Sequence, residues 1–525
     1  MNRTGASVLD ADPSDPTRSA NVLAGLLVPN PKRFPERGPA TVARLVEIAE
    51  IVISETPRRE RIVRSMRKAL GERVDLHDRI RAEHAARVTD VLLRELNPTE
   101  GQRFAQLLLD SELSTDEVVS LHRRHKIPVS ELEDDLLPVR GKGARIWDAQ
   151  GRTYLDLDSN YSATNLGNAN PELGQGLFNQ ACQLVSQKED RIQVARARFL
   201  KEIGDLLPPS LCCFYWQNSG GEAVDKALKI GKAYTGKTGV VAFEGGFHGR
   251  THGAVAVTHN PAYRQPFGLS SEPWVHFAPY GDLNAVDALL SRAGVGSVIL
   301  ELVQGEEAGV RPADPVFAQG LREMCDHHQA VLIVDEVQTG FGRVARTAGD
   351  WFASQRYGIE PDIMTIGKSF GGGYPVTAVV TNPEISERMK PGYDGSTFGG
   401  NPMAMTAALI ATRQMRRLNL TERVAEISRR VVRGLSAIES PLFLGFRVAG
   451  MMIGIDLISP ACVREIQDRL KTHGVHSSLS TGATMRWMPP LVITDEEMDY
   501  ALGAFWKSLG HVQGDYSEKI LDAAH

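Results

Sequence analysis

A lysine at the end of an apolar segment is the residue of this chain with the clearest chemical potential. Lys368 follows the apolar run Ile363–Ile366, and the earlier run Val331–Val334 leads directly into Asp335. An apolar run of this kind predicts a buried carboxylate, which needs a cation or a hydrogen-bond donor as partner. Pyridoxal phosphate requires such a pair, because a lysine forms a Schiff base with it and an aspartate pairs with its pyridinium nitrogen. The pair therefore indicates a pyridoxal phosphate site.

A glycine-rich segment upstream has the features of a phosphate site. Ser219, Gly220 and Gly221 follow an apolar strand and open a predicted helix. Free backbone N–H groups and the positive end of the helix dipole suit a phosphate dianion at that position. A small-residue loop that only caps the helix is an equally good interpretation of this segment alone. The segment is not a P-loop, because no Gly-Lys-Ser or Gly-Lys-Thr follows.

Four further side chains could contribute, although each is weak evidence by itself. Phe247 could stack on a planar ring, but most phenylalanines are core residues, and the adjacent His248 is more often a structural hydrogen-bonding group. Glu306 follows a strand in ELVQGEEAG, at the edge where open sheets bind ligands; a solvated loop is the competing interpretation. Thr397, in GSTFGGNP, could provide a second phosphate contact.

The elements that position these residues divide the chain into two regions of different predicted secondary structure. Residues 41–126 predict successive helices with capping residues at their starts, namely Thr41, Pro57, Asp75, Pro98 and Thr115. Residues 1–40 are rich in Pro, Ser and Asp and predict an arm or loop.

The second region, which contains predicted strands as well as helices, begins near Ile127. Residues 143–159 predict a β-hairpin, and from Pro171 onward short apolar runs alternate with helical stretches. This alternation predicts an α/β domain with a mostly parallel sheet covered on both faces. The tail predicts α+β structure, with a strand over Val448–Leu457 and a helix over Thr494–Leu509.

We therefore expect four regions. They are an N-terminal arm and helical extension (1–126), the N-terminal part of a small domain (127–165), a large cofactor-binding domain (166–400) and a C-terminal small domain (401–525).

Composition excludes few functions. The 525 residues carry a net charge of −5 with 23% charged residues, which gives no electrostatic footprint for nucleic acid. The five cysteines show no metal-binding spacing, and the polar N-terminus lacks the apolar region of a signal peptide. We expect a cytoplasmic protein without a metal site.

The order of these motifs carries more information than any one of them. A phosphate loop, an aromatic residue, a strand-end Asp, a lysine and a Gly/Thr loop succeed one another, and in this order the chain resembles the class III aminotransferases. The resemblance covers roughly residues 127–509. It implies a fold-type I pyridoxal-phosphate-dependent transferase, an α/β protein with a mostly parallel large-domain sheet and a smaller α+β domain, here with an added N-terminal helical region.

The resemblance also implies roles for the residues that match the family motifs. Lys368 would form the Schiff base and move the proton between the substrate Cα and the cofactor, while Asp335 keeps the ring nitrogen protonated. The remaining residues that would contact the cofactor are Ser219, Gly220, Gly221, Phe247, His248, Val337, Gln338 and Thr397. Because Thr397 would reach the phosphate of the neighbouring subunit, the resemblance implies a homodimer.

Three further matches concern the substrate. Arg486 matches an arginine that binds the α-carboxylate of an amino-acid donor, and Glu306 matches the glutamate that neutralises it when a substrate lacks that group. Tyr161 matches a tyrosine of an ornithine-type pocket. The aromatic residue that such a pocket has earlier in the chain is missing from residues 132–143. Ornithine and acetylornithine are therefore not favoured. Gly221 stands where the family often has a side chain, so one phosphate contact is absent.

We predict an aminotransferase that moves an amino group from L-glutamate or a similar donor to an aldehyde or ketone, in a specialised biosynthetic pathway. Aminomutation, decarboxylation or racemisation on the same scaffold is one alternative. The paired Arg486 and Glu306 favour two substrates over a single one. A transcription regulator with a pyridoxal-phosphate-binding domain is the other alternative, but no strand pair before Ile127 could form the wing of a winged helix.

Overall fold

The computed structural model describes residues 27, 42–53, 56–70, 80, 82–109, 115–133, 136–480 and 482–523, some of them by their backbone alone. The chain forms two compact units, residues 1–137 and residues 138–525. The boundary expected after residue 126 falls inside the first unit, and the finer division of the second unit stays a prediction. No helix in the described residues is long and apolar enough to cross a membrane.

The first unit contains the predicted helices. They are α3 (Val42–Val52), α4 (Thr56–Leu70), α5 (Ala82–Glu95), α6 (Pro98–Leu109) and α7 (Thr115–His125). Ile62, Leu92 and Phe104 are fully buried in a core of their own, which also takes up Leu27, the one described residue of the predicted arm. The rest of that arm lies outside the described residues.

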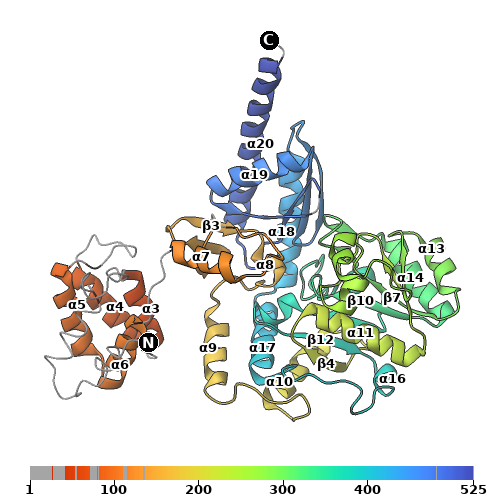
Figure 1. The fold of residues 1–525 in the computed structure, drawn as a ribbon, viewed down its shortest axis with the longest axis horizontal. Helices are drawn as coiled ribbons and strands as arrows, with labels where there is room; N and C mark the ends of the chain where they lie inside the picture. Colours follow the sequence, from red (N-terminus) through yellow and green to blue (C-terminus); the bar gives the residue numbers. More distant parts are fainter. Residues whose placement is uncertain are drawn as a thin grey trace. The chain divides into compact units, whose positions relative to one another are not determined.

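The second unit is built on a seven-stranded sheet, whose strand order is β4-β12-β11-β10-β7-β5-β6 (Figure 1). All neighbours are parallel except for β12, which runs antiparallel to β4 and β11. A mostly parallel sheet is therefore confirmed. In that order the strands are Cys213–Gln217, Thr377–Thr381, Ile363–Ile366, Val331–Glu336, Val295–Leu300, Gly239–Phe243 and Val275–Ala278.

Both faces of this sheet are buried, as the continuous apolar runs require. Val331 and Ile333 of β10 pack with the face covered by α11 (Gly220–Thr235). Leu332 and Val334 pack on the opposite face with α13 (Leu283–Leu290) and α14 (Pro315–His328). Other helices of this unit are α9 (Pro171–Ala181), α10 (Val194–Ile203), α12 (His252–Ala256), α15 (Ala353–Tyr357), α16 (Pro383–Ser386) and α17 (Pro402–Arg417).

Two four-stranded sheets and a two-stranded sheet of β8 (Val303–Gln304) and β9 (Arg311–Pro312) accompany this layer. The predicted hairpin is present as β2 (Arg145–Asp148) and β3 (Thr153–Asp156), in a sheet with β1 (Pro138–Lys142) and β15 (Val475–His476). A second sheet has the order β13-β14-β17-β16 and contains β17 (Thr484–Trp487) and β16 (Ser478–Leu479). Helices α18 (Leu420–Ser436), α19 (Pro460–Thr472) and α20 (Asp495–Ala523) belong to this part of the chain.

The prediction of one strand over Val448–Leu457 is wrong. That segment is a hairpin of β13 (Phe443–Ala449) and β14 (Met452–Leu457), with Gly450 in the turn at φ +61°. A Cβ at Gly450 would lie 2.4 Å from the carbonyl oxygen of Arg343, so both the conformation and the packing require glycine.

The parallel strands bring distant segments to one edge. The carboxyl ends of β4, β5, β7, β10 and β11 lie at the same side of the sheet, because these strands all run in one direction. In the pairing of β10 with β11, Asp335 stands opposite Thr365. Lys368 follows the end of β11 by two residues, so it emerges at the edge where Asp335 ends its strand.

Candidate active site

A cavity of about 340 Å³ opens at this carboxyl edge of the sheet. Its lining comes from the ends of β4, β5, β7, β10 and β11 and from the segment before β12. The lining includes most of the residues singled out from the sequence: Ser219, Gly220, Gly221, Phe247, His248, Glu306, Asp335, Val337, Gln338 and Lys368. Residues 149 positions apart in the chain, from Ser219 to Lys368, thus share one wall.

Lys368 is held in an unusual conformation. It begins a short 3-10 turn with φ +44°, a region that residues other than glycine rarely adopt and that often marks a functional constraint. Burial lowers the pKa of its amine below the ordinary lysine value, and the nearby Arg486 cation lowers it further, while the carboxylate of Glu306 acts in the opposite direction. A lowered pKa increases the share of neutral amine, which is the nucleophilic form.

Both carboxylate oxygens of Asp335 have hydrogen-bond partners. His248 Nδ1 lies 2.8 Å from Oδ2, and the Thr365 hydroxyl donates to Oδ1 over 2.8 Å. The amide of Val337 also donates to Oδ1 over 3.1 Å. The side chain is nearly buried, yet it lines the cavity. The carboxylate can therefore act on a cationic group in the cavity without moving, because its own bonds fix its orientation.

The segment before α11 forms a cradle of backbone donors. Ser219 caps the helix and its hydroxyl accepts from the amide of Glu222 over 3.3 Å. The amides of Gly220 and Gly221, in the first turn, have no intrahelical acceptor by position. Side chains are excluded here, since a Cβ at Gly220 would lie 2.9 Å from Val337 and one at Gly221 would lie 2.9 Å from the Thr251 hydroxyl. The missing side chain at Gly221 thus has a steric reason.

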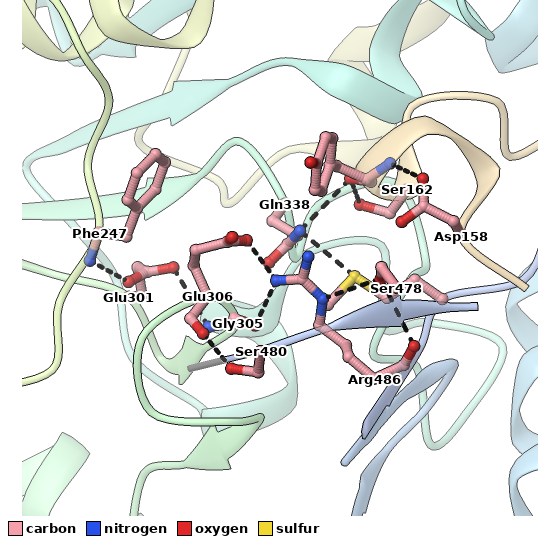
Figure 2. Close-up of polar contacts among 12 residues, drawn as sticks. Asp158, Ser162, Phe247, Glu301, Gly305, Glu306, Gln338, Ser478, Ser480 and Arg486 are labelled. Atoms are coloured by element: carbon pink, nitrogen blue, oxygen red, sulfur yellow. Dashed lines mark hydrogen bonds and ion pairs between the residues drawn. The ribbon is translucent and has the colours of Figure 1, made fainter. Parts of the chain in front are cut away.

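Arg486 and Glu306 form an ion pair beside the cavity (Figure 2). Arg486 lies on β17 and is fully buried; its Nη1 also donates to the carbonyl oxygen of Gly305 over 3.0 Å. Its Nε donates to the Ser478 hydroxyl over 3.3 Å, while its Nη2 has no partner among the described residues. One nitrogen of a buried guanidinium is therefore left to bind a further acceptor.

Three of the predicted residues do not line this cavity: Arg486, which pairs with the lining residue Glu306, and also Tyr161 and Thr397. The ring of Tyr161 lies 5.4 Å from the guanidinium of Arg486, and its carbonyl oxygen accepts from Gln338 Nε2 over 3.3 Å, so it borders the ion pair. Thr397 lines a separate cavity of about 630 Å³, with Ser396 and Phe398. Thr397 is thus absent from the Lys368 cavity of the same chain. This agrees with the expectation that it contacts the phosphate in a neighbouring subunit, which stays a prediction.

Glu301 is a site residue that the sequence analysis did not select. It follows β7, lines the cavity and accepts a hydrogen bond from the amide of Phe247 over 2.9 Å. Burial raises the pKa of its carboxyl to about 7, an effect that Asp335 strengthens and His248 opposes. The signal was present, because Glu301 ends the apolar run SVILE as Asp335 ends VLIVD.

The donor set fits pyridoxal phosphate. An amine with a lowered pKa, a fixed carboxylate and a pair of backbone N–H groups match the aldehyde, the ring nitrogen and the phosphate of that cofactor. Lys368 would hold it covalently, Asp335 would pair with the ring nitrogen, and Gly220 and Gly221 would bind the phosphate.

Comparison with known proteins agrees with this chemistry. Residues 128–509 match the family model of class-III aminotransferases. The chain belongs to the class-III aminotransferases. It is 37% identical over 379 residues to a [LysW]-aminoadipate semialdehyde transaminase of Deinococcus radiodurans, a match that covers 72% of this chain and 87% of the relative. It is 36% identical to an acetylornithine aminotransferase of Methanosarcina mazei, over 69% of this chain and 88% of the relative.

Solved structures give the same family and fold. The ornithine aminotransferase of Toxoplasma gondii superposes with a TM-score of 0.71 at 27% identity, covering 77% of this chain and 97% of the other. Class-III aminotransferases are pyridoxal phosphate enzymes, and a second structure of the Toxoplasma enzyme is described with partial occupancy of the cofactor at its active site. This class-III aminotransferase is therefore a fold-type I transaminase, and neither the regulator nor the non-transaminating alternatives are favoured.

The lowered pKa of Lys368 predicts a distinct reactivity. In the apoprotein, acetylation of Lys368 should reach half its maximal rate at a lower pH than acetylation of a lysine in an added unstructured reference peptide, because the buried amine loses its proton earlier. Peptide mass spectrometry over a pH series measures both sites in one sample. Equal midpoints for the two lysines would contradict the lowered pKa.

Proposed function

We propose that this class-III aminotransferase takes the amino group of L-glutamate or a similar α-amino acid and transfers it to the aldehyde or ketone of a second substrate. The observation that carries the proposal is the Arg486–Glu306 ion pair at the border of the Lys368 cavity. A guanidinium that can bind a carboxylate, and a glutamate that can replace that carboxylate, suit two substrates of different charge.

The chain's own residues would control the proton and the ring. Bound pyridoxal phosphate supplies an electron sink for the negative charge that develops at the donor Cα. In the proposal, Lys368 moves the proton at that carbon, and its lowered pKa supports a role as a base. Asp335 keeps the ring nitrogen protonated, because His248 and Thr365 fix its carboxylate beside the cavity.

Phe247, Val337 and Gln338 would hold the ring. All three line the cavity, and Val337 packs against the cradle, since its Cγ1 lies 2.9 Å from where a Cβ of Gly220 would stand. Ser219 would join Gly220 and Gly221 at the phosphate, at the positive end of α11. In this proposal His248 acts on the cofactor indirectly, by holding the carboxylate of Asp335.

The acceptor is proposed to be an aldehyde at the end of an aliphatic chain. The relative from Deinococcus radiodurans is a transaminase of an aminoadipate semialdehyde, and the one from Methanosarcina mazei is an acetylornithine aminotransferase. Tyr161 borders Arg486 and would contact such a chain. The missing early aromatic residue argues that the natural acceptor differs from the ornithine-type substrates.

We also propose that the enzyme is a homodimer with shared active sites. Thr397 lies outside the cavity of its own subunit, and the adjacent Phe398 is 58% exposed, as is Phe178 on α9. Large exposed apolar side chains near a site suggest a partner surface. All five cysteines are free, which supports a cytoplasmic location for the dimer.

Lys368→Ala tests the proposed function. Purified wild-type protein with pyridoxal phosphate should absorb visible light, and borohydride should fix the cofactor on Lys368. The variant should lose glutamate-dependent transamination by about 10³-fold or more, because both the covalent anchor and the base are removed. Lys201→Ala, on the exposed surface of α10, is the matched control. A Lys368→Ala protein that turns over glutamate within tenfold of wild type would refute the assignment.

Arg486→Ala tests the donor class. The variant should lower kcat/KM for glutamate by about 30-fold or more, since a buried charge pair to the donor carboxylate is lost, and change it little for a monoamine donor. Steady-state kinetics with both donors provide the ratio. Arg447→Ala, which removes an arginine paired with Asp456 on the same sheet, controls for loss of a charge. Equal losses with both donors would exclude a carboxylate clamp.

A further inference from the structure

The carboxyl group of Glu301 connects two loops of the active site. Its Oε2 accepts from the amide of Phe247 over 2.9 Å, and its Oε1 accepts from the amide of Gly305 at the longer distance of 3.5 Å (Figure 2). One loop follows β5 and carries the aromatic ring of Phe247. The other begins at Glu301 itself and passes through β8 to Gly305 and Glu306. A single buried side chain therefore hydrogen-bonds to both segments.

The Gly305 end of this connection leads directly to Arg486. The carbonyl oxygen of Gly305 accepts from Arg486 Nη1 over 3.0 Å, and the next residue, Glu306, forms the ion pair with the same guanidinium. The turn has no room for a side chain at this position, since a Cβ at Gly305 would lie 1.8 Å from Gln338 Oε1 and 2.8 Å from Met452. Displacing the Gly305 amide would therefore displace two of the partners of Arg486, the carbonyl oxygen of Gly305 and the carboxylate of Glu306.

The backbone of Glu301 is itself anchored. Its carbonyl oxygen accepts from the Tyr280 hydroxyl over 2.8 Å, and only about 7% of the residue is exposed. The backbone that carries the carboxyl group is thus held in place, and both loops donate hydrogen bonds to that group. Removing the carboxyl group would leave two buried N–H donors without an acceptor.

We propose that Glu301 is a positioning residue: it couples the loop that would stack on the cofactor ring to the Glu306–Arg486 pair, and so sets how strongly the site prefers a donor with an α-carboxylate. The proposal rests on the proposed function, because it concerns the donor selectivity of that same site. Hydrogen bonds connect the amide of Phe247 through Glu301 to the amide of Gly305, and the carbonyl oxygen of Gly305 connects to Arg486.

The connection depends on the protonation state of the carboxyl. The group faces His248 after β5, Asp335 on β10 and Lys368 after β11, with Glu306 and Arg486 beyond Gly305. Since burial raises its pKa to about 7, it is ionised above that pH and neutral below it. The ionised form offers an acceptor to each amide, whereas the neutral form carries a proton on one oxygen and weakens one of the two bonds.

Glu301→Gln tests the coupling, because the amide keeps one acceptor oxygen and presents an NH₂ group to the second loop. Glu307→Gln is the matched control: it makes the same change in the same loop, where Glu307 accepts from Asn260 over 2.8 Å. For each protein, pyridoxal phosphate binding to the apoprotein is measured by fluorescence. The ratio of kcat/KM for glutamate to that for a monoamine is measured from pH 6 to 8.5.

In the wild type and in Glu307→Gln, we expect this ratio to fall as the pH drops through about 7. In Glu301→Gln we expect a low ratio that is constant with pH, and pyridoxal phosphate binding about tenfold weaker, as the loss of one charge-assisted bond implies. A merely structural role would lower activity with both donors and leave the pH dependence of the ratio unchanged.

A Glu301→Gln protein whose ratio, pH profile and cofactor affinity stay within twofold of Glu307→Gln would overturn the inference and leave the proposed function intact. A wild-type protein that neither binds pyridoxal phosphate nor transaminates glutamate would overturn the proposed function, and the inference with it.

Discussion

The burial of Asp335 is the constraint on which the rest of the site depends. A carboxylate only about 5% exposed at the end of an apolar strand is costly unless it is fully hydrogen-bonded. His248 and Thr365 satisfy it from neighbouring elements, which requires β10 and β11 to pair in a single register and the loop after β5 to fold over the strand end. The same register brings Lys368 to the cavity. The fold thus holds the carboxylate of Asp335 in place. The proposed chemistry depends on the cationic ring nitrogen that this carboxylate can stabilise.

Much of this could be predicted from local pattern. Apolar runs that end in Asp335 or lead to Lys368 predict parallel strands, and parallel strands must place their carboxyl ends at one edge. What local pattern could not supply are contacts between distant residues. Glu301 gains its partner from Phe247, 54 positions away, and Glu306 is 180 positions from Arg486. The turn at Gly450 was missed for the same reason, since the backbone of Arg343 is what excludes a side chain there.

The ion pair of Arg486 and Glu306 fits substrate selection better than stability. Taking both charges out of water costs about as much as their attraction returns, so a buried pair is weak evidence of a stabilising role. Here the pair borders a cavity and leaves one guanidinium nitrogen without a partner in the described chain. An arginine held by a displaceable glutamate can exchange that partner for a substrate carboxylate at little net cost. In the proposed function, such an exchange would occur when a donor with an α-carboxylate is followed by an acceptor that lacks one.

The proposed function requires that Asp335 keeps the cofactor ring nitrogen protonated, so that the ring can act as an electron sink. The most direct measurement is the exchange of the glutamate Cα proton with solvent deuterium, followed by NMR in the pyridoxal-phosphate-loaded wild type and in Asp335→Asn. The amide removes the anion and retains the shape of the side chain. We expect the exchange to be slower by about 10²–10³-fold in Asp335→Asn, with the cofactor still attached to Lys368. Exchange within tenfold of the wild type, at full cofactor occupancy, would contradict it.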